Sequence, residues 1–178
     1  MVVNLEVPFP LDGGYLRRQC PCCGRQFKVL LTKEELVSTS RSAIEAYMVQ
    51  EASPGEEPVE GDDQEANLFC PYCGQAAPVS DWFTDEQVAY VRVIMSNVAA
   101  RLINEQFLKS LRGMNSSFLK VKTTDVPYEE EWISPEESDM RVVPLPCCGR
   151  SVKVLDDWAG PVHCFLCGFR HVERKEHQ

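Results

Sequence analysis

Nine cysteines dominate the chemistry that this chain of 178 residues could perform. Eight of them form four short groups, and a glycine directly follows each group. The groups are Cys20 with Cys23, Cys70 with Cys73, Cys147 with Cys148, and Cys164 with Cys167. A Cys-x-x-Cys turn delivers two thiolates from one tight bend, and four such thiolates suit the tetrahedral shell of zinc.

The first two groups predict one structural zinc site, with Cys20, Cys23, Cys70 and Cys73 as its ligands. The glycine after each turn lets the backbone bend, which frees amide groups to donate to the sulfurs. A long insertion separates the two pairs, but the entropic cost of closing a loop grows only with the logarithm of its length. Cys22 is left outside this site, either buried and inert or exposed beside several arginines.

An internal sequence repeat predicts the second site, because residues Pro146–Leu155 repeat the pattern of Pro21–Leu30. The alignment places Cys148 on Cys23, but it places Leu145 where Cys20 stands. Cys148, Cys164 and Cys167 are therefore the secure ligands. The fourth ligand stays open at this point, with Cys147 favoured over His163 and His171. The site could also be metal-free, or it could keep an open position for a catalytic water.

Composition narrows the class of protein. The formal net charge is −9, and this acidity disfavours indiscriminate binding to nucleic acid. We expect a cytoplasmic protein without a membrane segment, because the start of the chain lacks the features of a secretory signal and no apolar run is long enough to span a bilayer. Cys-x-x-Cys pairs in such a chain favour metal thiolates over disulfides.

Basic residues gather in the two repeats, while acidic residues crowd the stretches 51–65 and 125–139. The simpler interpretation of this charge distribution is that the acidic loops and the basic turns are both merely exposed to solvent. The sharper hypothesis is that the basic residues contact nucleic acid. The proposed contact set is Arg17, Arg18, Arg25, Lys28, Arg150, Lys153 and Arg170.

Two helices are predicted between the cysteine turns. The capping pattern at Thr32–Glu35 starts a helix from about residue 33 to residue 50, and an acidic loop follows over residues 52–67. A second capping pattern at Thr84 starts a long helix over residues 85–112, whose apolar stripe should pack on the shorter helix and both β modules. The less favoured alternative pairs residues 85–112 with a second copy in a dimer. Tyr128 and Trp132, within the second acidic stretch, should dock on the chain's own body, and docking on a partner is the less favoured alternative.

These patterns predict an α+β fold with two small zinc-ribbon β modules braced by two helices. Residues 1–83 form the first ribbon with its insertion, residues 84–122 the long helix and a short strand over 116–122, and residues 123–178 an acidic linker and the second ribbon. The turns resemble the rubredoxin-like knuckles of the zinc-ribbon superfamily, over roughly residues 15–31 with 68–80 and residues 141–172. That resemblance implies binding of nucleic acid or protein, and rarely catalysis.

The favoured hypothesis is a non-enzymatic zinc-binding adaptor, with nucleic-acid-handling machinery as its expected setting. A thiol redox or metal-responsive switch is the main alternative, because cysteines crowd around Cys22 and the second site is irregular. A zinc enzyme with an open second site ranks lowest, because the sequence contains no phosphate-binding loop, nucleophile elbow or His-Glu-x-x-His motif.

Overall fold

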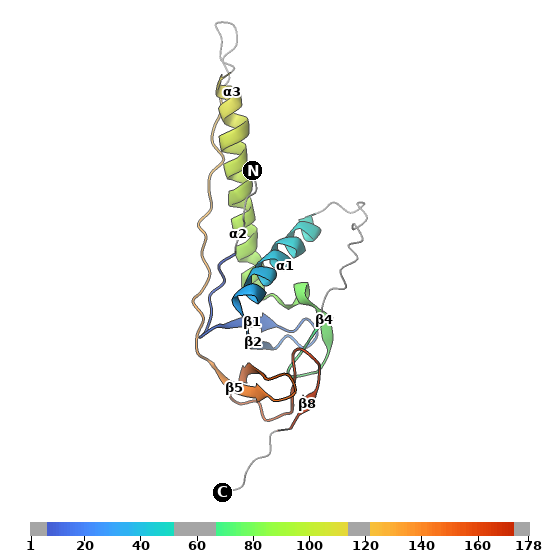
Figure 1. The fold of residues 1–178 in the computed structure, drawn as a ribbon. Helices are drawn as coiled ribbons and strands as arrows, with labels where there is room; N and C mark the ends of the chain where they lie inside the picture. Colours follow the sequence, from blue (N-terminus) through green and yellow to red (C-terminus); the bar gives the residue numbers. More distant parts are fainter. Residues whose placement is uncertain (1–6, 52–66, 114–121, 173–178) are drawn as a thin grey trace.

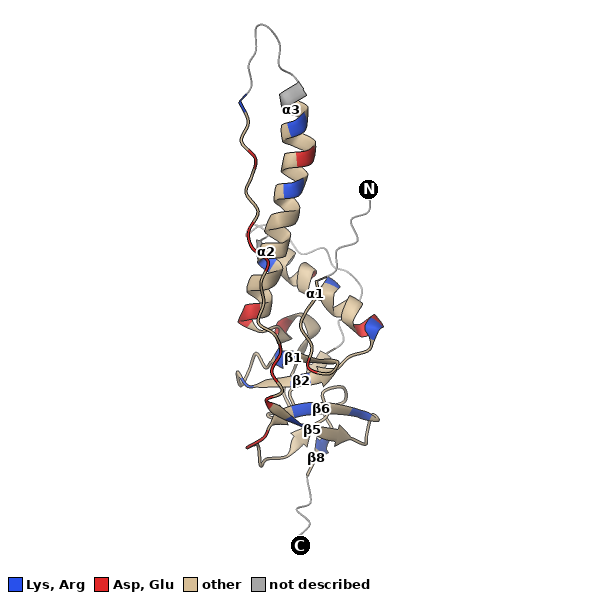
Figure 2. Ribbon diagram, turned by 90° about the vertical axis from the view of Figure 1, so that its left-hand side faces the viewer, with Lys and Arg blue, Asp and Glu red and all other residues tan. Residues whose placement is uncertain are grey.

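A computed structural model of the chain describes residues 7–51, 67–113 and 122–172. Two small β modules lie at one end of the molecule, and the helices stand on one side of them (Figure 1). The longer helix projects away from the β modules, and an extended segment runs back beside it (Figures 1 and 2). The fold is α+β, as the sequence predicts.

Each β module consists of two antiparallel hairpins, and a cysteine turn closes each hairpin. The strands of the first module are β1 (Tyr15–Gln19), β2 (Gln26–Leu30), β3 (Asn67–Phe69) and β4 (Ala76–Pro78). The strands of the second module are β5 (Met140–Leu145), β6 (Arg150–Leu155), β7 (Val162–His163) and β8 (Arg170–His171). Short strands thus enter and leave every cysteine turn, as the sequence predicts.

The two modules share one four-stranded sheet in the order β1-β2-β6-β5. Strands β2 and β6 pair antiparallel, with Lys28 opposite Lys153. These two lysines hold the same position in the repeated sequence, so each repeat meets its counterpart at the centre of the sheet. Whether residues 1–83, 84–122 and 123–178 fold as separate units stays a prediction, although this sheet joins the first and the last of them.

The β3-β4 and β7-β8 hairpins also contact each other through equivalent positions of the two modules. The N–H of Phe69 donates to the carbonyl of Phe165 at 2.9 Å, and the N–H of His163 donates to the carbonyl of Pro71 at 2.8 Å. Phe69 and His163 each precede the first cysteine of a turn, and Pro71 and Phe165 each follow it. The two bonds are therefore equivalent, and the modules are related by approximate two-fold symmetry.

Glycines keep two further equivalent contacts open. A Cβ at Gly74 would lie 3.1 Å from the ring of His163, and one at Gly168 would lie 2.9 Å from the ring of Phe69. Both glycines have positive φ, 71° and 70° respectively. Any larger residue at either position would therefore strain the backbone and push the two modules apart.

Side chains from both modules build one core. Phe27 packs edge-on against Trp82 and Tyr72, with ring centroids 5.6 and 6.3 Å apart. The Tyr72 hydroxyl donates to the carbonyl of Gln26 at 2.7 Å and accepts from the N–H of Leu155 at 3.0 Å. One phenol thus bridges β2 of the first module to β6 of the second.

The helices begin where their capping patterns predict. Helix α1 (Lys33–Glu51) follows Thr32, whose hydroxyl accepts from Glu35 N–H at 3.2 Å while the Glu35 carboxylate accepts from Thr32 N–H at 2.7 Å. Thr84 and Gln87 form the same reciprocal pair at the start of α2. The long helix consists of α2 (Asp85–Leu102), a π-helical stretch η2 (Ile103–Leu108) and α3 (Lys109–Gly113), and a 3₁₀ turn, η1 (Val79–Trp82), precedes it.

The long helix packs differently from the prediction. Its buried side chains Tyr90, Val91 and Ile94 join a cluster with Ala43 of α1 and Leu16 of β1. The predicted packing on the shorter helix and on the first ribbon is therefore confirmed. In the described residues this cluster holds no side chain of the second ribbon, so that part of the prediction is wrong. Residues 101–113, which we call the arm, extend beyond this cluster. Its apolar residues Leu102, Ile103 and Phe107 are exposed, because the core ends before the helix does.

Residues 122–139 have no regular secondary structure and lie along the long helix; we call them the strap (Figure 1). Asn104 exchanges two hydrogen bonds with the backbone of Val126, at 2.8 and 2.9 Å. Asn97 does the same with Glu129, at the same two distances. Tyr128 and Trp132 nevertheless remain 57% and 66% exposed. The prediction that these aromatics dock on the chain's own body is wrong, because the strap is attached through its backbone and its carboxylates.

Several predictions fall outside the described residues. They include most of the acidic loop 52–67 and nearly all of the predicted strand 116–122. Val7 and Phe9 are buried against α2 without belonging to a strand. Within the part of the chain that the structure describes, no helix combines the length and apolarity needed to cross a bilayer.

Candidate metal centres

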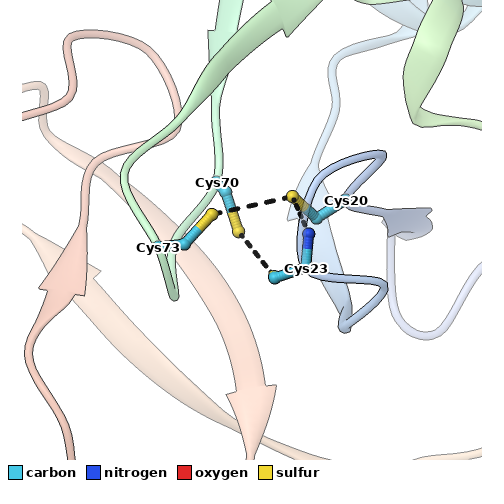
Figure 3. A group of neighbouring side chains, drawn as sticks. All are labelled: Cys20, Cys23, Cys70 and Cys73. Atoms are coloured by element: carbon cyan, nitrogen blue, oxygen red, sulfur yellow. Dashed lines mark hydrogen bonds between the residues drawn. The ribbon is translucent and has the colours of Figure 1, made fainter.

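The first module brings four thiols from two hairpin turns to one point. Cys20 and Cys23 lie in the turn between β1 and β2, and Cys70 and Cys73 lie in the turn between β3 and β4 (Figure 3). The sulfurs of Cys20 and Cys73 are 3.8 Å apart, and those of Cys23 and Cys70 are 3.7 Å apart. A tetrahedral zinc ion with Zn–S bonds of about 2.3 Å needs sulfurs about 3.8 Å apart. The four thiols therefore fit a zinc ion.

The backbone of the turns supports the thiolates. The N–H of Cys23 points to the sulfur of Cys20 at 3.4 Å, and the N–H of Tyr72 points to the sulfur of Cys70 at the same distance. Gly24 and Gly74 both adopt a φ of 71°, which closes each turn. Such donors stabilise the negative charge that a metal thiolate retains.

Burial controls the protonation of this group. Cys20 and Cys70 are 1% and 0% exposed, and burial raises the pKa of both thiols above the ordinary value. Burial also raises the pKa of Cys23, but hydrogen bonds from the backbone of Arg25 and from neighbouring thiols outweigh it, so its pKa is lowered. An isolated buried thiolate is unfavourable, whereas a thiolate bound to a cation is not. Metal binding at this group must therefore displace protons.

The second module assembles a group of different construction. Cys147, Cys148, Cys164 and Cys167 lie together, with their sulfurs within 4.8 Å of one another. The separations are 3.6 Å for Cys148 to both Cys164 and Cys167, and 3.7 Å for Cys147 to Cys167. These distances also fit a tetrahedral zinc ion.

The second group differs at the position of Cys20. Leu145 stands there, is 0% exposed and belongs to the core that both modules share. Cys147 supplies the fourth sulfur instead, directly beside Cys148 in sequence. Of the two histidines considered as the fourth ligand, His163 turns its Nδ1 toward the carbonyl of Pro71 at 3.3 Å. His171 instead places Nε2 3.1 Å from the sulfur of Cys147.

The thiols of the second group are more exposed than those of the first, since Cys147 and Cys167 both face solvent. A hydrogen bond from the backbone of Phe169 lowers the pKa of Cys167 to about 7. Burial and contacts with the other thiols raise the pKa of Cys147 to about 12. Cys167 is thus ready as an anionic ligand near neutral pH, whereas Cys147 gives up its proton to a metal.

Neither a family model, nor a curated protein, nor a solved structure matches this chain. The two four-cysteine groups are compatible with zinc-ribbon-like sites. That statement rests on the spacing of the sulfurs and on the hairpins that carry them.

Cys22 is exposed and lies outside both groups. Of the arginines that the sequence placed beside it, Arg18 is turned away and is 1% exposed. Its guanidinium lies over the ring of Phe83 at 4.7 Å and donates to the hydroxyl of Thr39 at 3.3 Å. Burial lowers the pKa of Arg18 to about 10, so the group still carries a charge at neutral pH.

The basic residues proposed as a nucleic-acid contact set do not form one open surface. Lys28 and Lys153 are 0% and 8% exposed and face the same carboxylate, Asp12. Arg17 pairs with Glu136 at 3.0 Å and with Asp139 at 2.9 Å, both in the strap. The strap therefore covers basic side chains of the first ribbon with its own acids.

The remaining members of that set lie apart. Arg150 bonds both carboxylate oxygens of Glu35, at 2.6 and 2.7 Å. Arg25 lies over the ring of Trp158 at 5.1 Å. Arg170 is exposed on β8. Binding of nucleic acid stays a prediction, but as placed here the set offers few free cations.

Sequence reasoning did not identify Asp12 or Tyr72 as organising residues. Asp12 directly precedes two glycines, and Tyr72 occupies one of the two variable positions between Cys70 and Cys73. The available signal was the complementary charge of the repeats and the acidic stretches, which indicates pairing without showing which residues pair.

Proposed function

We propose that this protein is a non-enzymatic zinc-binding adaptor. In this proposal two zinc ions hold the paired ribbons together, and the arm with its strap contacts a protein partner. The observation that carries the proposal is the spacing of 3.6–3.8 Å between neighbouring sulfurs in both groups. That spacing supports two tetrahedral shells of four thiolates.

A shell of four protein ligands favours a structural role for the metal. Catalytic zinc usually has three protein ligands and keeps one position for water or substrate. In each group the four sulfurs already supply every position of a tetrahedron. Because protein sulfurs occupy all four positions, the arrangement argues against the zinc-enzyme hypothesis and favours a binding protein whose shape depends on its metals.

The charges favour protein over nucleic acid as the partner. Phosphate contacts require free lysines and arginines, but Arg17 and Arg150 are occupied by carboxylates, and Lys28 is buried. Figure 2 shows acidic positions distributed along the strap beside the long helix. These acids would repel a phosphate backbone.

Five of the eleven large apolar side chains that are exposed in the described residues lie on the arm and strap. They are Leu102, Ile103, Phe107, Tyr128 and Trp132, each between 39% and 66% exposed. Aromatic side chains among charged residues are enriched at protein interfaces. We therefore expect a partner surface with apolar side chains flanked by basic residues, complementary to Glu129, Glu130 and Glu131 of the strap.

Native mass spectrometry of the purified protein tests the metal part of this proposal. We expect two zinc ions per chain, and a chain that carries no metal would refute it. A mobility-shift assay with single- and double-stranded oligonucleotides at low salt tests the choice of partner. A salt-sensitive shift would contradict the preference for a protein partner.

Site-specific photo-crosslinking in cells tests the arm. A photoreactive amino acid at Phe107 or Trp132 should give a discrete protein adduct, and one at the exposed Val142 on β5 serves as the matched control. An adduct at Val142 without one on the arm would place the contact on the ribbons instead.

A thiol switch remains a second candidate because Cys147 and Cys167 are exposed, 3.7 Å apart at their sulfurs. Hydrogen peroxide would join the two zinc-bound sulfurs, each thiolate losing one electron, while the peroxide takes up these two electrons and two protons from solvent and is reduced to two water molecules. Release of one zinc ion with a loss of two mass units from the chain would support this candidate. An unchanged mass and metal count would exclude it.

A further inference from the structure

The second metal group carries a fifth ligand atom. His171 Nε2 lies 3.1 Å from the sulfur of Cys147, which is closer than the 3.6–3.7 Å that separate the neighbouring sulfurs of that group. Imidazole nitrogen is a common zinc ligand, with a bond of about 2.0–2.1 Å. A donor suited to zinc therefore borders the shell at one particular thiol.

The fold holds His171 in this position independently of Cys147. His171 belongs to β8, where it pairs with Val162 of β7. Its ring packs edge-on against Phe169 with ring centroids 5.0 Å apart. Because β8 follows the turn that carries Cys164 and Cys167, the imidazole would stay beside the group when Cys147 moves away.

Cys147 is the most replaceable of the four thiols. It is exposed, as Cys167 is, whereas Cys164 is buried. Its counterpart in the first repeat is Cys22, which lies outside the first metal group. It also shares one turn with the adjacent Cys148, and two neighbouring residues have less freedom to satisfy one tetrahedron than the pair in a Cys-x-x-Cys turn.

We propose that Cys147 and His171 are alternative fourth ligands of the second metal, which can pass from four thiolates to three thiolates and one imidazole without losing the ion. This inference rests on the proposed zinc binding. In the exchange the sulfur of Cys147 leaves the metal with its electron pair, and Nε2 of neutral His171 donates its own pair in return. The charge of the centre rises by one unit, and Cys147 becomes a free nucleophile.

The exchange makes Cys147 a modification site. With an alkyl halide such as iodoacetamide, the released thiolate attacks the carbon, an S–C bond forms, the C–I bond breaks and iodide leaves. The alkylated sulfur is a poor ligand, but the imidazole already occupies its place. The metal therefore survives a modification that would open a shell built from four thiolates alone.

Alanine variants separate the two ligands. We expect Cys147→Ala to retain two ions in native mass spectrometry, and Cys147→Ala with His171→Ala to retain one. With cobalt in place of zinc, the single variant should show weaker sulfur-to-metal charge-transfer absorption at the second site than the parent. Cys23→Ala in the first group is the matched control and should lose one ion, because the described structure gives its sulfur no such histidine.

Alkylation of the zinc-loaded protein gives a second readout. In a Cys22→Ala background, iodoacetamide should first add one carbamidomethyl group at Cys147 with both ions retained. With His171→Ala also present, the same addition should release one ion. His163→Ala serves as the control for a general effect of removing a histidine and should leave both ions in place.

The outcomes distinguish a failure of the proposed zinc binding from a failure of the proposed ligand exchange. A parent protein without metal would refute the proposed function. A parent with two ions and a Cys147→Ala variant with one would overturn the ligand exchange alone. Retention of both ions by Cys147→Ala with His171→Ala would overturn it too, and would reduce His171 to a hydrogen-bond partner of the sulfur.

Discussion

Lys28 and Lys153 lie opposite each other across β2 and β6, and both ammonium groups bond Oδ2 of Asp12, at 3.0 and 2.6 Å. Two like charges thus meet where the repeats pair, and one carboxylate from the turn before β1 lies between them. Lys28 also contacts Glu136 and Asp139 of the strap. The centre of the sheet is therefore held by carboxylates that neither copy of the repeat contains.

Removing the shared carboxylate should destabilise this centre. In Asp12→Asn the two lysines remain buried, and Lys153 loses its carboxylate. We expect a loss of about 2 kcal/mol in the free energy of unfolding, less than the ~3–5 kcal/mol for a fully buried pair because Asp12 keeps some exposure. Urea denaturation of the zinc-loaded protein measures this loss. Glu105→Gln on the arm is the control, and an equal effect there would contradict the role of Asp12.

The same pair sets a dependence on pH. Bonds from Lys153 and Lys28 lower the pKa of Asp12 below its ordinary value of 3.8. Its contribution to stability is therefore fully present above that value and is lost as the pH falls through the lowered pKa. The difference between wild type and Asp12→Asn should accordingly stay constant from neutral pH down to about pH 5. A difference that shrinks within this range would show that another group carries the effect.

Tyr72→Phe should loosen the contact between the modules. The change removes a hydroxyl that bonds both Gln26 and Leu155, and it leaves the N–H of Leu155 without that partner inside the protein. A buried donor left unpaired costs about 1–3 kcal/mol, which denaturation can measure. Tyr128→Phe provides the control, because that side chain is exposed. Equal stability of the two variants would contradict the bridging role.

Metal binding should release protons. Burial raises the pKa of Cys20 and Cys70, so both thiols are protonated in the metal-free protein near neutral pH and must lose their protons to bind zinc. Zinc affinity should therefore fall as the pH is lowered. Titration calorimetry in buffers of different ionisation enthalpy measures the protons released. An enthalpy that does not depend on the buffer would rule out neutral thiols in the metal-free state.

The arm should contribute little to the stability of the isolated chain. Phe107→Ala changes an exposed side chain, and we expect an effect within about 0.5 kcal/mol. Ile94→Ala changes a buried residue of the cluster between α1 and α2 and should cost about 2–5 kcal/mol. Denaturation at two protein concentrations completes the test. A large effect of Phe107→Ala that grows with concentration would indicate a dimer through residues 85–112, the alternative that stays a prediction.

The sequence predicts local features of this protein well because their causes are local. Thr32 and Thr84 start helices because each is followed three residues later by a side chain that caps in return. The cysteine turns can be identified because their spacing and glycines belong to one short bend. These features identify seven of the eight thiols that the structure brings together, and the starts of both helices.

Features that join distant segments could not be predicted in this way. Lys28 resembles a surface lysine until β6 covers it and Asp12 pairs with it. The apolar residues after Ala100 continue the helical stripe of α2, but periodicity does not show where the core beneath a helix ends. The fourth thiol of the second group could not be predicted locally either. Leu145 stands at the position of Cys20 because its side chain is buried in a core that both modules build, so Cys147 supplies the sulfur instead.

The pairing of equivalent strands has a consequence for fragments of this chain. A polypeptide that held only the second ribbon would leave β6 with an unsatisfied edge, and an open edge of this kind templates association with another chain. The surface best matched to that edge is β6 of a second identical fragment, joined in the register that now holds β2. Each half of the protein thus contains a strand suited to pairing with the same strand of a second copy. Covalent linkage of the two halves makes that pairing intramolecular.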